Sequence, residues 1–240
     1  PSNACNVPQE RLTALSFEDI RNLVYLLAAV LFIFGLKGLT HPRTAARGNM
    51  LGAIGMLLAV IVTLLDKQII GWAAIVIGLI VGATIGALAA VRVKMTAMPQ
   101  LIALLNGFGG AASMLVAGAE LHKFIDKAQA RVTGGAELTA EFHGAILAEG
   151  QSPTQVLLAV ALSGLIGAVT LTGSVLAFAK LQELISSSPV TAVAIKVANS
   201  VLALICITLA VALFRSPTDI WLYWALVVVA SLLGIGLVAP

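Results

Sequence analysis

The chain has 240 residues, of which 60% are hydrophobic and only 10% are charged, and its mean hydropathy is +1.04. A soluble domain has about 45–50% apolar and about 25% charged residues, so this composition indicates a membrane protein and excludes water-soluble enzyme folds, disordered chains and collagen-like repeats. The net charge of +3 comes from fourteen Lys and Arg residues scattered through an apolar sequence, and because they form no basic face, we expect no nucleic-acid partner.

Seven uncharged apolar runs predict an all-α bundle of transmembrane helices that contacts membrane lipid. A helix needs roughly 20 mostly apolar residues to cross a bilayer. The runs cover residues 22–36, 48–65, 69–91, 98–119, 154–179, 197–214 and 220–240. We therefore expect four spans within 22–119 and three within 154–240.

The remaining stretches are polar and predict the parts outside the bilayer. Residues 1–21 form a polar N-terminal flank that lacks the apolar core of a signal peptide. Residues 120–153 are polar and of mixed charge, and we expect them to form an external loop in water. The last run ends at Pro240 without a polar tail, which is typical of a cut boundary.

The basic residues of the short loops predict the orientation of the chain. Those after the first, third and fifth spans are Lys37, Arg43, Arg47, Arg92, Lys94, Lys180 and Lys196. Those on the opposite side, leaving out 120–153, are Arg11, Arg21, Lys67 and Arg215. Because cytoplasmic loops carry an excess of Lys and Arg, we expect the N-terminus outside and the C-terminus in the cytoplasm.

Glycines spaced one helical turn apart predict close helix packing in the second and third spans. They are Gly48, Gly52 and Gly55, and Gly78, Gly82 and Gly86. Small residues at this spacing let helix backbones approach each other in lipid, so both helices are expected to pack inside the chain or against a partner subunit. A ligand approaching the glycine backbone is the less favoured alternative.

No glycine string has the strand, helix and acidic residue of a dinucleotide-binding fingerprint. The separations of the three histidines fit no compact metal motif. We therefore expect neither a cofactor-binding residue nor a metal site in this chain.

The predicted spans contain neutral polar residues but no Asp, Glu, Lys, Arg or His. A relay of titratable side chains made from these helices alone is therefore excluded. Ser113, Ser163 and Thr208 are expected to bond to a carbonyl one turn back in their own helices. The amide of Asn106 cannot be fully satisfied within its own helix, so a local role and a helix contact or water-lined path both remain open.

Three motifs follow one another along the chain: LFIFGLKGL at 31–39, MTAMPQ at 95–100 continuing to LNGFGG at 105–110, and GAVTLTGSV at 167–175. In sequence, order and spacing they resemble the membrane part of the beta subunit of proton-translocating NAD(P) transhydrogenase. From residue 196 onward the resemblance is one of hydropathy alone.

The resemblance implies an enzyme, a translocase, that couples two processes. Hydride passes between NAD(H) and NADP(H) in soluble domains while protons cross the membrane domain. It implies that NADP and NAD bind outside this chain, that an alpha subunit is the partner, that the whole assembly is a dimer, and that it lies in the bacterial inner membrane. Family members continue with two more helices and an NADP-binding domain, before which this sequence stops.

The resemblance also implies a proton path with a neutral lining. Asn106 stands where many family members have a histidine of the proton path, and Ser174 matches a serine near it. Ser113 and Thr170 share the polar faces of these two helices and complete the lining. Because Asn cannot titrate, the ionisable group is expected on the companion subunit, while these side chains order water or bond a partner's imidazole.

Two alternative interpretations belong to other classes of protein. A transporter or channel subunit with its own substrate site would be expected to have broken helices or a buried charge near the midplane, and the sequence indicates neither. A non-catalytic scaffold subunit would use its glycine faces only to assemble other subunits.

Overall fold

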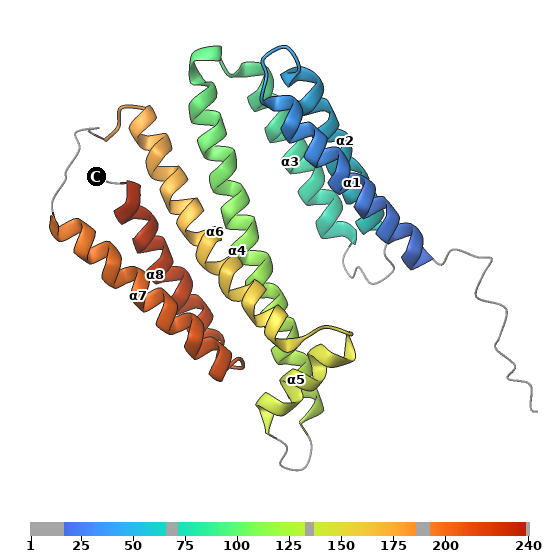
Figure 1. The fold of residues 1–240 in the computed structure, drawn as a ribbon, viewed down its shortest axis with the longest axis vertical. Coiled ribbons are helices and arrows are strands. Elements are labelled where there is room, and N and C mark those ends of the chain that lie inside the picture. The colour runs from blue at the N-terminus through green and yellow to red at the C-terminus, as the bar shows by residue number, and fades with distance from the viewer. Residues whose placement is uncertain (1–16, 66–71, 133–136, 186–192, 239–240) are drawn as a thin grey trace, which may run out of the picture. The chain divides into compact units, whose positions relative to one another are not determined.

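The computed structural model describes residues 17–65, 72–132, 137–185 and 193–238, and all regular structure in these residues is helical (Figure 1). The elements are α1 (Phe17–Leu39), α2 (Ala45–Leu64), α3 (Trp72–Arg92), the short 3-10 helix η2 (Met95–Ala97), α4 (Met98–Arg131), α5 (Leu138–Ala148), α6 (Pro153–Leu181), α7 (Val193–Arg215) and α8 (Ile220–Val238). Among the described residues, seven helices are long and apolar enough to cross a membrane. The prediction of an all-α protein with seven spans is thus confirmed.

Proline and basic residues mark the two ends of each of the two longest helices, α4 and α6. A proline occupies the first turn of α4, at Pro99, and of α6, at Pro153, where a missing N–H costs no hydrogen bond. Arg131 and Lys180 lie in the last turns, where a cation interacts favourably with the helix dipole. These signals set the ends of both helices. Of the predicted polar flank, residues 1–16 lie outside the described residues, and the orientation across the membrane stays a prediction.

The segment 120–153, expected as a polar loop, is largely helical, because α4 continues to Arg131 and α5 follows. On α4 the buried residues of this part recur at helical spacing: Leu121, Phe124, Ile125 and Ala128. They pack against α5, where the ring of Phe142 meets that of Phe124 edge-on with centroids 6.3 Å apart. Because most residues of this segment are polar, its amphipathic helical pattern was not recognised from the sequence. That the segment lies outside the membrane on the external side stays a prediction.

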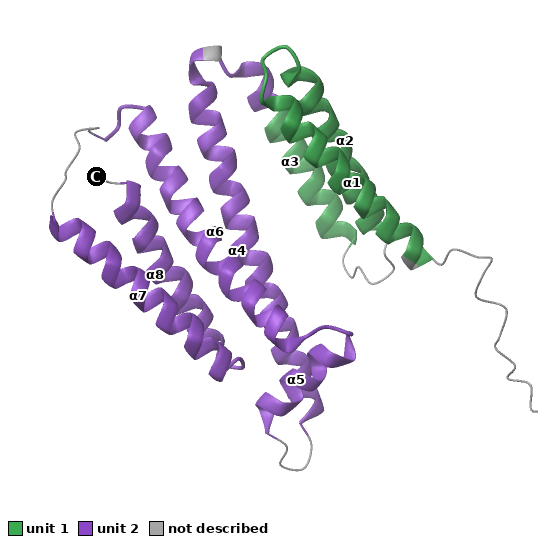
Figure 2. Ribbon diagram, viewed as in Figure 1, with its two compact units in different colours: residues 1–87 green, residues 88–240 purple. Residues whose placement is uncertain are grey.

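The chain divides into two compact units, residues 1–87 and 88–240 (Figure 2). In the first unit, α1 and α2 touch backbone to backbone: a Cβ atom placed on Gly48 would lie 2.6 Å from the carbonyl oxygen of Gly35. The hydroxyls of Tyr25 and Thr63 also join the two helices at 2.8 Å. Glycine is therefore required at this crossing, because a side chain would force the helices apart.

In the second unit the core lies between α4, α5, α6, α7 and α8. Tyr223 of α8 is fully buried, and its ring lies between two glycines: a Cβ on Gly118 of α4 would be 2.9 Å from the ring, and one on Gly164 of α6 would be 2.7 Å from it. Its hydroxyl donates a hydrogen bond to the carbonyl oxygen of Met114. One aromatic side chain thus links α8 to both α4 and α6.

Candidate functional site

The α4 and α6 helices are in backbone contact within the second unit. A Cβ on Gly110 would lie 2.6 Å from the carbonyl oxygen of Gly167, and a Cβ on Gly167 would lie 2.6 Å from that of Gly110. The polar side chains of α6 follow this contact: Thr170 Cβ is 2.9 Å from the Cβ position of Gly110, and Ser174 Cβ is 3.2 Å from that of Gly107. The close approach therefore places Thr170 and Ser174 directly against α4.

Ser113 of α4 and Ser163 of α6 meet across this interface, with their hydroxyl oxygens 3.2 Å apart. Both are half-buried. The expected bond to a carbonyl of the same helix holds for Thr208, whose hydroxyl donates to Leu204 at 2.8 Å, but the two serines are joined between helices instead. The glycine contact brings the helices near enough for the two hydroxyls to interact, which in lipid is a favourable way to satisfy them.

Amide side chains connect the start of α4 with the end of α6. Gln100 Nε2 of α4 donates to the carbonyl oxygen of Leu181 at 2.8 Å, and Gln182 Nε2 donates to Gln100 Oε1 at 2.6 Å. Neither glutamine was predicted from the sequence to belong to a functional site. Together with Ser113 and Ser163, these contacts place polar groups at several levels of the α4/α6 interface.

Asn106 lies on α4 with an exposed side chain, and among the described residues no hydrogen-bond partner of its amide is found. It precedes Ser113 and Glu120 at intervals of seven residues, and such positions share one face of a helix because seven residues make nearly two turns. The structure therefore brings Ser113, Thr170 and Ser174 into the α4/α6 interface, while the side chain of Asn106 on α4 is exposed.

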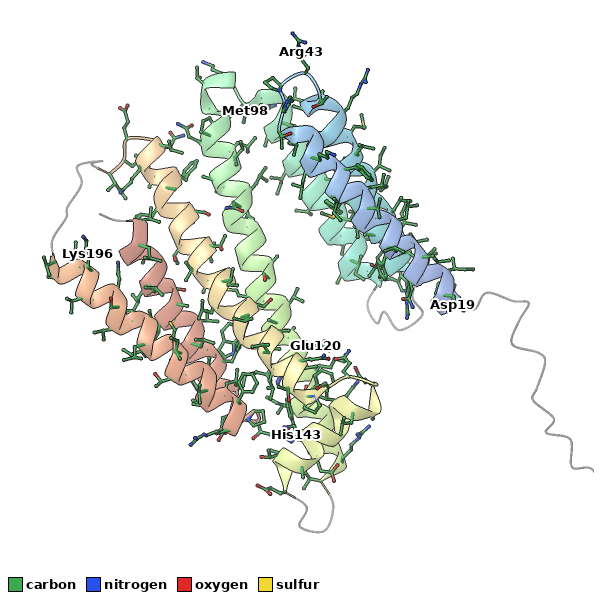
Figure 3. The ribbon with its side chains drawn as sticks, in the orientation of Figure 1. Asp19, Arg43, Met98, Glu120, His143 and Lys196 are labelled. Atoms are coloured by element: carbon green, nitrogen blue, oxygen red, sulfur yellow. The ribbon has the colours of Figure 1, made fainter. Side chains whose placement is uncertain are left out.

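A groove of about 570 Å³ runs along α4 and α6. Small and apolar side chains line most of it, and its polar lining consists of Ser113, Ser163, Glu120 and Gln151. Figure 3 labels Met98 at the start of α4 and Glu120 farther along it, on the way to α5. The groove thus connects the serine pair with a carboxylate at one end.

Charged side chains meet at the Glu120 end. Lys123 Nζ lies 2.9 Å from Glu120 Oε1 and 3.4 Å from Glu149 Oε2, and Lys127 also contacts Glu149. The hydrogen bond from Lys127 is the main reason that the pKa of Glu149 is below its usual value, although partial burial acts in the opposite direction. Glu120 was missed from the sequence because it stands one residue beyond the predicted span. Its heptad spacing from Ser113 was the available signal.

The glycines that the sequence singled out differ in their surroundings. Gly48 lies against α1, and the backbone nitrogen of Gly52 is 3.1 Å from the Cβ position of Gly35. On α3, a Cβ added to any of the three glycines would meet open space; these are Gly78, Gly82 and Gly86. Within this chain the α3 glycines thus have no close neighbour among the described residues.

Among the described residues, no group of three or more His, Cys, Asp or Glu side chains that could hold a metal ion is found. The polar groups at the α4/α6 interface are neutral hydrogen-bonding side chains, with one carboxylate at the end of the groove.

Comparison with known proteins gives consistent matches. The family model for the NAD(P) transhydrogenase beta subunit matches residues 21–240. The NAD(P) transhydrogenase subunit beta of Rhodospirillum rubrum is 39% identical over 167 residues, which is 70% of this chain and 32% of the relative. The protein of the same name from strain ATCC 11170 of that species gives the same values. The chain thus spans about a third of the length of these relatives.

Proposed function

The chain belongs to the NAD(P) transhydrogenase beta-subunit family, and on this premise we propose that it forms the proton-translocating membrane part of such a subunit. It is a multi-pass membrane protein. In the complete enzyme, proton passage along these helices is coupled to hydride transfer between NAD(H) and NADP(H). Both nucleotides bind in soluble domains outside this chain.

The observation that carries the proposal is the row of polar groups between α4 and α6. Glu120 and Gln151 line one end of the groove, and Ser113 and Ser163 meet farther in. Outside the groove, Gln100 near the start of α4 bonds to the end of α6. Polar groups are costly inside a bilayer and are kept there mainly for packing or for the passage of ions. A chain of hydrogen-bonded water needs such groups as anchors.

The four neutral residues have two kinds of role in this proposal. Ser113, Thr170 and Ser174 lie in the interface and orient water by accepting and donating hydrogen bonds. The exposed amide of Asn106 on the same helix supports a role in bonding a group that another chain supplies. Because none of the four can titrate near neutral pH, that group carries the ionisable side chain.

The partner that supplies it is the alpha subunit, and the whole assembly is a dimer in the bacterial inner membrane. The excess of Lys and Arg in the loops after the first, third and fifth spans favours a cytoplasmic C-terminus. The glycines of α3 have no neighbour within 4 Å of their Cβ positions among the described residues, and a face of small residues suits close packing of a helix from a partner subunit.

The direct test replaces Asn106 with Leu in the complete enzyme, reconstituted in lipid vesicles. Proton pumping driven by hydride transfer is expected to fall by about tenfold or more, because Leu cannot hold water or bond a partner's imidazole and a tenfold loss corresponds to about 1.4 kcal/mol in the barrier. The rate is measured with a pH-sensitive dye inside the vesicles.

The matched control is Phe108→Leu, which changes an exposed side chain of α4 two residues away and is expected to leave pumping unchanged. Co-purification of the alpha subunit with each variant shows that the complex still assembles. Wild-type pumping by the Asn106→Leu enzyme would contradict the proposed role of this residue.

A further inference from the structure

Glu120 stands at the point where α4 leaves the apolar part of its sequence. Residues 98–119 contain no charged side chain, and this length of helix is about 33 Å, close to the roughly 30 Å hydrocarbon thickness of a bilayer. The Glu120 side chain is 39% exposed and at the same time lines the α4/α6 groove. One carboxylate is thus both exposed and part of the groove lining.

The groove leads from Glu120 to the serine pair. Ser113 lies seven residues before Glu120 on the same face of α4, about 10 Å deeper along the helix axis. Ser163 of α6 faces Ser113 across the groove. Among the side chains that line the groove, Glu120 is the only one that carries a carboxylate.

The charged groups around Glu120 come from α4 and from the end of α5. Lys123 of α4 contacts its carboxylate, and Glu149, which follows α5, contacts the same lysine. On the α6 side the neighbouring group that lines the groove is the neutral Gln151. The pair His122 and Asp126 starts two residues after Glu120, which is about 200° around the helix, and so faces away.

The ion pair itself gives little reason for a carboxylate at this position. An exposed Lys–Glu pair one turn apart adds little to stability. Glu149 already contacts both Lys123 and Lys127, and the apolar contacts of α5 with α4 are made without Glu120. The carboxylate of Glu120 therefore has a place in the groove that packing does not explain.

We propose that Glu120 is the proton-exchanging residue at the mouth of the α4/α6 groove, an inference that rests on the proposed function. Its carboxylate takes a proton from water on the α5 side, forming an O–H bond. That bond breaks when the proton passes to water held in the groove towards Ser113 and Ser163, and the carboxylate is restored. Passage in the other direction is the reverse, and no electron transfer is involved.

The test measures proton translocation by the complete enzyme in vesicles as a function of pH on the α5 side. Glu120→Gln keeps the shape of the side chain but cannot exchange a proton, so translocation should fall about tenfold or more and lose most of its pH dependence. Glu120→Asp restores a carboxylate and should keep at least about half of the rate. These magnitudes follow from the usual contribution of a positioned proton donor.

Two controls separate proton exchange from structure. Glu137→Gln makes the same chemical change at an exposed residue beside α5 that is outside the groove lining, and should behave as wild type. Lys123→Met removes the ion pair but leaves the Glu120 carboxylate, so it should retain most of the rate. The amount of assembled enzyme is measured for every variant, and rates are given per assembled complex.

Several outcomes would overturn the inference. Wild-type translocation and pH dependence in Glu120→Gln would do so, as would an equal loss in Glu120→Asp or in Lys123→Met, because the loss would then come from packing or from the ion pair. If the wild-type enzyme pumps but Glu120→Gln is normal, only this inference fails. If the wild-type enzyme moves no protons, the proposed function itself fails.

Discussion

Helix α3 and the α4/α6 pair are all strongly apolar and rich in glycine, but their glycines have different surroundings. Helix α3 is more apolar than α6, but none of its residues is buried, whereas seven residues of α6 are. The α3 glycines face open space, whereas Gly110 and Gly167 are in backbone contact. The stronger glycine pattern in the sequence thus belongs to the helix that packs less within the chain.

The difference shows what glycine spacing does and does not determine. In lipid there is no hydrophobic force between helices, so glycines permit a close approach without choosing the partner. At α4/α6 the choice is supported by further contacts, which include the Ser113–Ser163 pair, the Gln100–Leu181 bond and the Tyr223 ring. On α3 none of the 21 residues is buried in the described structure, and no comparable set of contacts accompanies its glycines.

The largest loss of stability is expected when a side chain is introduced at the glycine contact between α4 and α6. Gly110→Ile places a branched side chain where a Cβ already lies 2.6 Å from the Gly167 carbonyl oxygen, and overpacking of this kind costs about 1–3 kcal/mol or more. Thermal unfolding of the detergent-solubilised protein should shift to lower temperature. Gly82→Ile on α3 adds the same side chain to open space and should leave the unfolding temperature unchanged; equal shifts would show that the two regions do not differ as described.

A smaller effect is expected from the polar contact that accompanies the glycines. Ser113→Ala, Ser163→Ala and the double variant form a cycle that isolates the coupling between the two hydroxyls. Interhelical hydrogen bonds in membrane proteins average about 0.6 kcal/mol, and we expect a coupling of about this size in the free energy of unfolding. Additive single-variant effects would mean that the 3.2 Å contact contributes nothing to the choice of partner.

The smallest effect on stability is expected where α4 contacts the end of α5 through charged side chains. Because the pKa of Glu149 is lowered in the folded protein, its contribution to stability is present above the ordinary value of about 4.5 and is lost as the pH falls through the folded-state pKa. An exposed pair contributes about 0–1 kcal/mol. The protection factors of the α5 amides in hydrogen exchange should therefore fall slightly below pH 4.5.

Glu149→Gln is the control for that measurement. It should remove the additional loss of protection at acid pH while leaving the apolar contacts between Phe124 and Phe142 in place. If the wild-type protein and this variant respond equally to acid, the charged contacts do not hold α5.

The spans were predictable because each long helix must satisfy its backbone internally and place apolar side chains in lipid, so composition alone identifies it. The helices within 120–153 were not predictable, because four buried residues at helical spacing on α4 lie among many polar side chains. Within the site, residue type indicated Ser113, Thr170 and Ser174. The sequence could not indicate that Ser113 meets Ser163 or that Glu120 lines the same groove.

The sequence by itself determined the fold class, the seven spans and the neutrality of their interiors, since these follow from which side chains a bilayer accepts. Only the tertiary structure decided which glycines touch, which hydroxyls pair and which carboxylate opens onto the groove. The physical reason is that lipid is equally compatible with every apolar face of a helix. The register and partner of each helix therefore depend on short-range contacts, such as that of Gly110 with Gly167, that no pattern along one helix contains.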